Sequence, residues 1–184
     1  MDQTSDNRLM EEVRDEKVER LAILFERQHI MLYNFFLRLT GNRGISEDLV
    51  QDVFFRILKY RKTYRSQSKF TVWMYQIARN THIDHLRKQK QEVPLEEQFE
   101  ETESHEVDTV ERMVGEVDVE LLRKALDKLP IRKREILVLS RYQEMKYKDI
   151  AQLFSCSVGT IKAVVHRAIK DLRRIYCQLQ GGTP

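Results

Sequence analysis

The chain has 184 residues, of which 33% are charged and 41% are hydrophobic, and its formal net charge is +3. This length and composition fit a globular protein of two small domains. Only six Gly and three Pro are present, and no segment alternates apolar with polar residues, so the sequence excludes a β-sheet protein and predicts an all-α fold. Because it has no apolar run of membrane-spanning length and no secretory start, we expect a cytoplasmic protein without membrane insertion.

Charge is strongly segregated along the chain. Residues 91–120 contain twelve Asp and Glu but only one basic residue, Arg112, so the rest of the chain carries a net charge of about +14. The acidic segment has few large apolar residues and repels itself, so burial cannot offset the entropy cost of ordering it. We therefore predict an acidic flexible linker over 92–117, which joins helical domains at 1–91 and 118–184.

A helix hairpin is predicted in the first domain. The Gly-Asn-Arg-Gly run at 41–44 separates two segments with helical periodicity. The first segment has apolar residues at Leu21, Leu24, Phe25, Met31, Leu32, Phe35, Phe36 and Leu39. In the second segment Ser46 is the expected N-cap, with Glu47 and Asp48 near the positive end of the helix. The expected buried stripe of this second helix is Leu49, Val53, Ile57 and Tyr60.

Another face of the same helix carries carboxylates around an aromatic ring. Four residues share this face, at spacings of three, one and three: Asp48, Gln51, Asp52 and Phe55. An exposed aromatic side chain among acidic groups fits a docking surface for a basic partner. The alternative is a solvated acidic patch in which the preceding helix covers Phe55.

A polar loop at 63–69 precedes a segment that combines aromatic and basic residues. Aromatic rings beside cations suit binding to unpaired bases, which stack on the rings while the cations attract phosphate. Trp73, however, shares a helix face with Ile77 and is expected in the core. We therefore place the base contacts in the loop and on Asn80.

The sequence offers no credible catalytic or metal site. The His-Ile-Asp-His run at 82–85 lacks the i, i+4 spacing at which helical histidines converge on one ion. We find no Gly-rich phosphate loop, no Ser/His/Asp set and no isolated carboxylate pair. Cys156 and Cys177 lie far from any metal-binding or redox spacing and are assigned no chemistry. We expect no enzyme activity, no metal and no cofactor.

The C-terminal segment predicts a helix-turn-helix. An amphipathic stretch at 147–154 is followed by a polar turn and by Ser157, whose hydroxyl can accept a first-turn amide as an N-cap. The helix that follows has a basic arc opposite an apolar face formed by Ile161, Val165, Ala168 and Leu172. A recognition helix needs this division, since one face seats it on its domain while the other meets base edges in the major groove. The alternative is a solvated cationic helix.

In this order, the segments resemble the bacterial RNA polymerase sigma factors of the extracytoplasmic-function type, group IV of the sigma-70 family, over most of the chain. Residues 48–54, Asp-Leu-Val-Gln-Asp-Val-Phe, are similar to the segment that grips the clamp helices of the largest polymerase subunit. Residues 68–80 and 84–87 resemble the region that reads and melts the minus-ten element. Leu-Pro at 129–130, Arg-Glu-Ile at 134–136, Asp-Ile-Ala at 149–151 and Val-Gly-Thr-Ile-Lys at 158–162 resemble the domain that reads the minus-thirty-five element.

The resemblance implies three sets of site residues. Core polymerase would be bound through Asp48, Gln51, Asp52 and Phe55. Minus-ten DNA would be contacted by Tyr64, Arg65, Ser66, Gln67, Ser68, Lys69, Arg79, Asn80 and Arg87. Minus-thirty-five DNA would be contacted by Thr160, Lys162, Ala163, His166, Arg167, Lys170 and Arg173.

The chain departs from the family pattern at three places. Residues 76–77 are Gln-Ile where housekeeping sigma factors carry the Trp pair that wedges the duplex open, so melting would rely on Asn80 and the loop. Residues 163–164 are Ala-Val where the family often has Ser-Arg. Residues 66–68 are Ser-Gln-Ser where many relatives have a Gly-Asp-Ser run.

The resulting prediction is a dissociable initiation subunit that binds core polymerase through the clamp helices and the flap, directs it to promoter DNA and catalyses no reaction itself. The resemblance also implies that an anti-sigma factor can be a partner. The alternative is a stand-alone helix-turn-helix regulator with a helical dimerisation domain, which would bind an operator as a free protein.

Overall fold

The computed structural model of the protein describes residues 4–92 and 119–181. All regular structure in these two ranges is helical, with no strand, which confirms the all-α prediction. None of the helices in the described ranges is both long and apolar enough to cross a membrane. The acidic linker predicted over 92–117 lies, apart from residue 92, outside the described residues.

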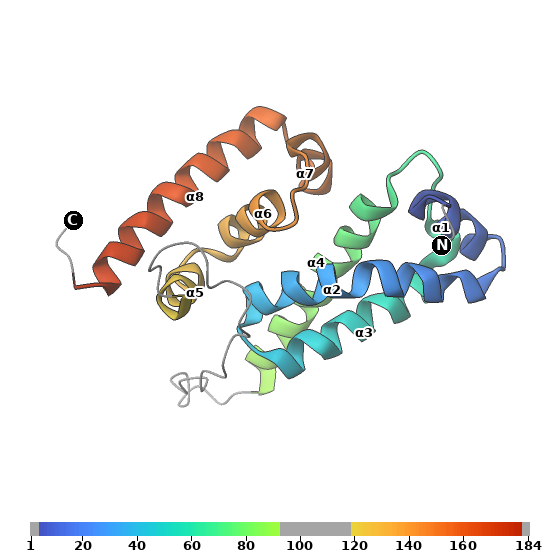
Figure 1. The fold of residues 1–184 in the computed structure, drawn as a ribbon, viewed down its shortest axis with the longest axis horizontal. Coiled ribbons are helices and arrows are strands. Elements are labelled where there is room, and N and C mark those ends of the chain that lie inside the picture. The colour runs from blue at the N-terminus through green and yellow to red at the C-terminus, as the bar shows by residue number, and fades with distance from the viewer. Residues whose placement is uncertain (1–3, 93–118, 182–184) are drawn as a thin grey trace.

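The first domain is built on a hairpin of two long helices (Figure 1). Its elements are α1 (Asp6–Arg14), η1 (Val18–Arg20), α2 (Leu21–Thr40), α3 (Arg43–Tyr60), η2 (Arg61–Thr63) and α4 (Phe70–Glu92). α2 packs against α3, α3 packs against α4, and α1 lies against α2 and the start of α4. The largest fully buried side chains here include Phe35, Phe36, Phe70 and Met74, so removal of aromatic and aliphatic surface from water stabilises the domain.

The turn between α2 and α3 confirms the predicted hairpin but corrects its cap. Gly41 ends α2 in the left-handed conformation, with φ of 66°, which a side chain would strain. A Cβ at Gly41 would also lie 2.6 Å from Nη1 of Arg123. The N-cap of α3 is Asn42, whose Oδ1 accepts from the amide of Ile45 at 3.0 Å. The prediction of Ser46 as the cap was wrong, because Ser46 lies buried within α3 and donates to the carbonyl of Asn42 at 2.6 Å.

The buried stripe of α3 was also predicted one residue too long. Leu49, Val53 and Ile57 are buried, whereas Tyr60 is 45% exposed. Tyr60 is the last residue of α3, where the chain tightens into η2. There Nζ of the exposed Lys59, and not the core, lies over its ring, 5.5 Å from the centroid.

The second domain contains α5 (Val119–Asp127), α6 (Ile131–Arg141), α7 (Tyr147–Leu153) and α8 (Val158–Leu179). α5, α6 and α7 all pack against α8. Ser157 is the N-cap of α8 and accepts from the amide of Thr160 at 3.0 Å. On the inner face of α8, the side chains of Ile161, Val165 and Ala168 are buried and that of Leu172 is partly buried. These contacts confirm the helix-turn-helix prediction, including its cap and its apolar face.

The two domains pack against each other through one face of each. α4 lies against α7, and the C-terminal half of α2 meets α5 and α6 (Figure 1). Buried residues of both domains belong to one hydrophobic cluster. α8 lies on the side of the second domain away from the first, with α5, α6 and α7 between them (Figure 1). The arrangement therefore leaves the predicted recognition helix on an outer surface.

Candidate functional site

The predicted docking face of α3 is fully accessible. Asp48, Gln51, Asp52 and Phe55 are all exposed, and Phe55 is 66% exposed. The preceding helix covers Phe54 instead, whose ring lies edge-on to Phe25 of α2 with centroids 4.9 Å apart. The alternative in which Phe55 is covered is therefore excluded, and an apolar ring stands among two carboxylates where a partner can reach it.

An apolar groove continues this face toward α2. It has a volume of about 350 Å³ and is lined by Phe25, His29, Ile30, Tyr33, Glu47, Val50 and Gln51. Ile30 is 60% exposed and Phe25 is 39% exposed. Exposed apolar side chains gathered in one groove are typical of a protein-binding surface. Sequence reasoning missed the α2 half of this surface, because it used Phe25 only as one of the apolar positions that indicate a helix.

The loop between η2 and α4 has an internal anchor and exposed polar residues. Tyr64 is buried, with 2% of its surface exposed, and its hydroxyl donates to the carbonyl of Ser68 at 2.9 Å. Its ring packs edge-on against Trp73, and burial raises the pKa of Tyr64 to about 12. The predicted contact of Tyr64 with DNA does not fit this position, since the ring supports the loop from inside. The exposed loop residues are Arg65, Ser66, Gln67 and Lys69, while Ser68 is half-buried.

The helix that follows the loop presents its predicted DNA-binding residues to different surroundings. Asn80 and Arg87 are exposed, whereas Arg79 is half-buried. Nε of Arg79 donates to Oε2 of Glu135 in α6 at 3.1 Å. The guanidinium of Arg79 also lies 3.9 Å from the ring centroid of Phe154, a geometry that favours cation–π attraction.

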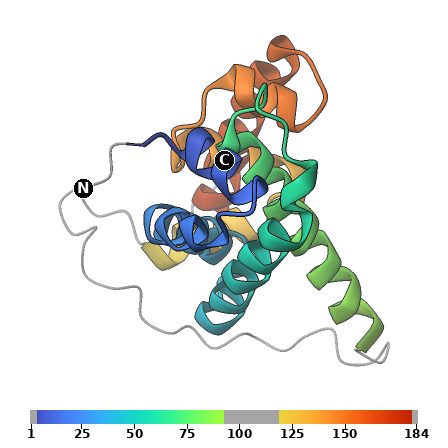
Figure 2. The ribbon, with the colours of Figure 1, turned by 90° about the vertical axis from the view of Figure 1, so that its right-hand side faces the viewer.

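Further polar contacts join the loop and α4 to the second domain. Nζ of Lys69 lies 2.7 Å from Oδ2 and 2.9 Å from Oδ1 of Asp149 in α7. The hydroxyl of Tyr75 donates to Oε1 of Gln143 at 3.0 Å, and both side chains are buried. Figure 2 shows the loop before α4 rising beside α7. Two cations predicted to bind minus-ten DNA are thus already paired with carboxylates of the other domain.

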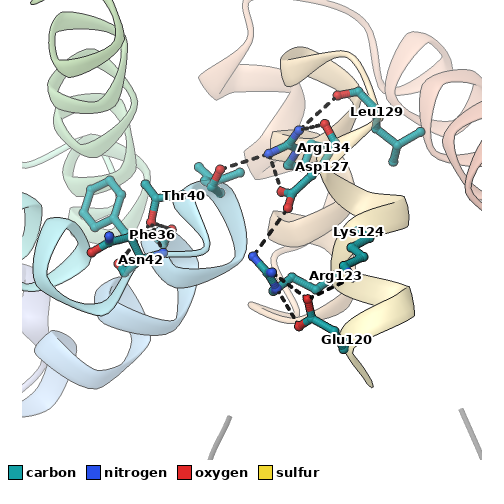
Figure 3. Close-up of polar contacts among 10 residues, drawn as sticks. Phe36, Thr40, Asn42, Glu120, Arg123, Lys124, Asp127, Leu129 and Arg134 are labelled. Carbon is teal, nitrogen blue, oxygen red and sulfur yellow. Dashed lines mark hydrogen bonds and ion pairs between the residues drawn. The ribbon is translucent and has the colours of Figure 1, made fainter. Parts of the chain in front are cut away.

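A second polar cluster joins the end of α2 to α5 and α6 (Figure 3). Nη1 of Arg134 donates to the carbonyl of Leu39 at 3.0 Å and to Oδ1 of Asp127 at 2.9 Å. Burial lowers the pKa of Arg134 and raises that of Asp127, because both charges lose part of their hydration. On α5, Arg123 pairs with Glu120 at 2.7 Å. This cluster ties the second domain to the turn at Gly41.

Between the domains lies an open groove of about 560 Å³. It is lined by Gln76, Arg79, Ile83, Leu86, Arg87, Ile131, Arg132, Glu135, Leu153, Phe154 and Ser155. Among the described residues, no group of three or more His, Cys, Asp or Glu side chains is arranged to hold a metal ion. The lining of the groove combines apolar side chains with the arginines Arg79, Arg87 and Arg132.

The exposed arc of α8 contains every residue predicted to contact minus-thirty-five DNA. All seven are exposed: Thr160, Lys162, Ala163, His166, Arg167, Lys170 and Arg173. An ion pair between Lys133 of α6 and Asp171 of α8, 2.7 Å long, fixes the helix on its domain. Exposed cations on one arc and an anchored apolar face on the other are what a major-groove helix requires.

Sequence reasoning missed the helix α1 and its contacts with the loop. Nη1 of Arg14 donates to Oγ of Ser66 at 2.9 Å, and Oδ1 of Asn7 accepts from the amide of Phe70 at 2.7 Å. The sequence did carry a signal for this helix. Ser5 is its N-cap, and the apolar residues Leu9 and Val13 follow at a spacing of four.

The chain matches known proteins in both domains. Residues 24–92 match the family model of Sigma-70 region 2, and residues 120–172 match that of Sigma-70, region 4. The ECF RNA polymerase sigma factor SigM of Bacillus subtilis (strain 168) is 32% identical over 146 residues, which cover 79% of this chain and 88% of SigM. The ECF RNA polymerase sigma factor EcfG of Rhodopseudomonas palustris (strain TIE-1) is 34% identical over 141 residues, 75% of each protein.

Solved structures agree with these matches. The sigma factor RpoE from Bartonella quintana, determined with the anti-sigma factor NepR, has a TM-score of 0.70 at 27% identity and covers 84% of this chain and 94% of its own. CnrH, determined with the cytosolic domain of CnrY, has a TM-score of 0.69 at 17% identity and covers 92% of this chain and 96% of its own. At this identity the match shows a similar fold. A stand-alone regulator is therefore not supported. Together, the identity to SigM over most of both proteins and the two sigma-70 regions show that the chain belongs to the ECF family of RNA polymerase sigma factors, which direct core polymerase to promoters.

Proposed function

We propose that the two domains of this promoter-specific sigma factor divide the work of initiation. The first, residues 1–91, binds core polymerase and the minus-ten element, and the second, residues 118–184, binds the minus-thirty-five element, with residues 92–117 as the linker. The main support is that all seven predicted minus-thirty-five residues are exposed on the arc of α8 opposite its buried face. As a sigma factor, the chain is an initiation factor and not an enzyme.

Core polymerase docks on the exposed face of α3, in this proposal. Asp48 and Asp52 pair with basic residues of the clamp helices, Gln51 adds a polar contact, and Phe55 supplies a desolvated aromatic anchor. Complementary charges around an apolar centre favour rapid and specific association. The second domain contacts the flap, and the linker lets the two contacts form at the spacing that polymerase sets.

The minus-ten element is read by the exposed part of the loop and by α4. Arg65, Ser66, Gln67, Ser68 and Lys69 form a pocket edge for an unpaired base, with Tyr64 beneath it. Arg79, Asn80 and Arg87 continue the surface along the helix. Because Lys69 and Arg79 pair with carboxylates of the second domain, phosphate replaces those carboxylates when the promoter binds.

An anti-sigma factor is a further proposed partner. The support is the similarity to the Bartonella quintana sigma factor RpoE, which was determined in complex with the anti-sigma factor NepR. We also place the protein in the cytoplasm, where polymerase and promoter DNA are found. An anti-sigma factor would hold the chain inactive by competing with core polymerase and promoter DNA for the surfaces described above.

Reconstitution with core polymerase tests the proposal as a whole. The purified chain is expected to co-purify with core polymerase and to give run-off transcripts from a subset of a genomic fragment library. Binding of a palindromic operator by the free chain, without polymerase and without transcripts, would instead support a stand-alone regulator.

Charge reversal tests the docking face. Asp48→Lys with Asp52→Lys is expected to weaken core binding by about 2–5 kcal/mol, the range for charge pairs buried in an interface. Both side chains are exposed, so the free fold should be retained. Glu19→Lys changes an exposed carboxylate of η1 and serves as the matched control. Equal affinity of both variants in a titration with core polymerase contradicts the assignment.

A loop exchange tests minus-ten reading. Replacing Ser-Gln-Ser at 66–68 is expected to change the preferred unpaired base. Flipping a base out of the duplex costs free energy, and a pocket recovers this cost only for the base that fits it. Permanganate reactivity and transcription from a randomised minus-ten library measure this preference. An unchanged preference in a folded variant would place specificity along α4, from Arg79 to Arg87.

A further inference from the structure

The first helix, α1, is a fixed part of the first domain although it precedes the region matched to Sigma-70 region 2, which begins at residue 24. Leu9, Met10 and Val13 of α1 are fully buried. Asp6 accepts hydrogen bonds from Arg27 at 2.8 Å and from Gln28 at 2.6 Å, both in α2. Apolar burial and a carboxylate anchor together hold α1 in one place against the hairpin.

From this position α1 contacts the far end of the minus-ten loop, where α4 begins. Phe70 is the first residue of α4, so its amide has no carbonyl partner within the helix. Oδ1 of Asn7 accepts from this amide at 2.7 Å. The start of α4, directly after Lys69, is thereby capped by a side chain from another helix.

Arg14, at the C-terminal end of α1, contacts the middle of the loop. Its Nη1 donates to Oγ of Ser66 at 2.9 Å. Its Nε and Nη2 donate to the carboxylate of Asp15 at 2.8 Å and 3.1 Å. The two hydrogen bonds to Asp15 fix the plane of the guanidinium, so that Nη1 is directed at Ser66 of the loop.

Glu16 contacts η2, the short helix that leads into the loop. It follows α1 with φ of 78°, a left-handed conformation that residues other than Gly rarely adopt. Its carboxylate pairs with Arg61 at 3.2 Å and with Lys62, both in η2. A strained backbone is retained only where surrounding contacts offset its cost, and here those contacts hold the segment that leads into the loop.

We propose that α1 and the turn after it position the minus-ten loop, with Asn7, Arg14 and Glu16 as positioning residues for base selection. The inference rests on the proposed reading of the minus-ten element by this loop. Figure 1 shows α1 beside the loop that leads into α4. One contact with the middle of the loop and one with each helix that flanks it order the loop before DNA arrives, so capture of a flipped base costs less conformational entropy.

The test uses the full chain assembled with core polymerase. Asn7→Ala and Arg14→Ala are each expected to slow promoter opening roughly two- to tenfold, the range of one net hydrogen bond, and to broaden the preferred unpaired base. Core affinity and upstream protection should not change, because the docking face of α3 and the exposed arc of α8 are untouched. Permanganate reactivity over time measures opening, and footprinting measures upstream protection.

Two further variants separate positioning from general stability. Arg8→Ala removes the same charge from the same helix, where Arg8 is exposed and its ion pairs within the described residues are with Glu11 and Glu12 of α1, and it should open promoters normally. Asn7→Asp keeps an acceptor oxygen for the amide of Phe70 and should restore normal opening. A double-mutant cycle of Arg14→Ala with Ser66→Ala should show coupling, with the combined loss smaller than the sum of the two single losses.

The outcomes distinguish this inference from the function on which it rests. If exchange of residues 66–68 changes base preference but the Asn7 and Arg14 variants open promoters like Arg8→Ala, the positioning role is overturned and loop reading stands. If the exchange has no effect on base preference, loop reading itself fails. If Arg8→Ala slows promoter opening as much as Asn7→Ala and Arg14→Ala do, α1 has a structural role only.

Discussion

The two surfaces proposed to read promoter DNA are both basic, but they differ in what their cations contact within the chain. Lys69 and Arg79 on the minus-ten side pair with Asp149 and Glu135 of the second domain. The predicted residues of α8 are exposed on the side away from the first domain (Figure 1). In the proposed function, promoter DNA displaces carboxylates at the minus-ten surface and water at the minus-thirty-five surface. Reading of the minus-thirty-five element would leave these interdomain ion pairs intact, whereas reading of the minus-ten element would break them.

The two cross-domain ion pairs also differ in burial. The side chains of Arg79 and Glu135 are 15% and 3% exposed, whereas those of Lys69 and Asp149 are 53% and 12% exposed. Removing one partner of a buried pair leaves a charge without compensation, which is costly. An exposed pair is screened by water and contributes little. Of these two ion pairs, the one between Arg79 of α4 and Glu135 of α6 is therefore the more costly to break.

The largest expected effect comes from Glu135→Gln, which removes the charge opposite Arg79 with little change in shape. Domain packing should weaken by about 3–5 kcal/mol, the usual cost of breaking a buried pair. Fluorescence transfer in the free chain measures the separation, with one label on the exposed Cys177 and the other on an exposed position of α3. The separation should increase.

Asp171→Asn is the control for this change. It removes the pair between Lys133 and Asp171, which lies within the second domain, so the distance between the labels should stay the same. Equal distances in the Glu135 variant and the original chain would show that the pair between Arg79 and Glu135 is not needed to hold the domains together.

The next largest effect is expected from substitution of the proposed base-reading side chains on α8. Lys162→Ala and Arg167→Ala should each weaken use of promoters with an upstream element by about 1–3 kcal/mol, if each reads a base. Footprinting of the holoenzyme measures upstream protection. Arg174→Ala is the matched control, since Arg174 is 59% exposed on the same helix but outside the predicted set. The same loss in the control would mean that α8 contributes only net charge.

A smaller effect is expected from Asp149→Asn, which releases the exposed cation Lys69. Affinity of the free chain for single-stranded minus-ten DNA should rise by about 0.2–1 kcal/mol, at most roughly fivefold. Fluorescence anisotropy at low salt measures this affinity. The gain should vanish when Lys69→Ala is also present. Glu144→Gln, at an exposed carboxylate of the same domain, should give no gain, and an equal gain there would point to net charge alone.

The smallest change in sequence discrimination is expected from Arg173→Ala. If Arg173 contacts phosphate only, binding should weaken alike for all sequences and the slope of log affinity against log salt should fall by about one. Binding titrations at several salt concentrations, on matched and scrambled upstream elements, measure both quantities. A change in discrimination would instead make Arg173 a base-reading residue.

Several features of the site could be predicted from short-range sequence patterns. The turn at Gly41, the Ser157 cap and the buried face of Ile161, Val165 and Ala168 depend on contacts within a few residues, and the structure contains all of them. Helical phase also placed Phe55 on the face of Asp48 and Asp52, although only the structure showed that no helix covers it. Helical geometry fixes which side chains share a face, and this information is complete in the local sequence.

Other features depend on packing between distant segments. Tyr64 looks like a loop residue available to DNA, but Trp73 and the carbonyl of Ser68 hold it inside. Phe25 has the spacing of a core residue, yet it is 39% exposed beside α3. Periodicity assigns a residue to a face, while the neighbour that covers this face is chosen by the whole fold.

The sequence by itself determined the helical class, the hairpin turn, the helix-turn-helix and the division of α8 into an apolar and a basic side, because each depends on local periodicity and capping. Only the tertiary structure decided that Lys69 and Arg79 pair across the domains, that α1 contacts the loop through Asn7 and Arg14, and that α8 remains on the outside. These contacts join residues separated by 52 to 80 positions in the chain. Their formation depends on how whole helices pack, which no short stretch of sequence specifies.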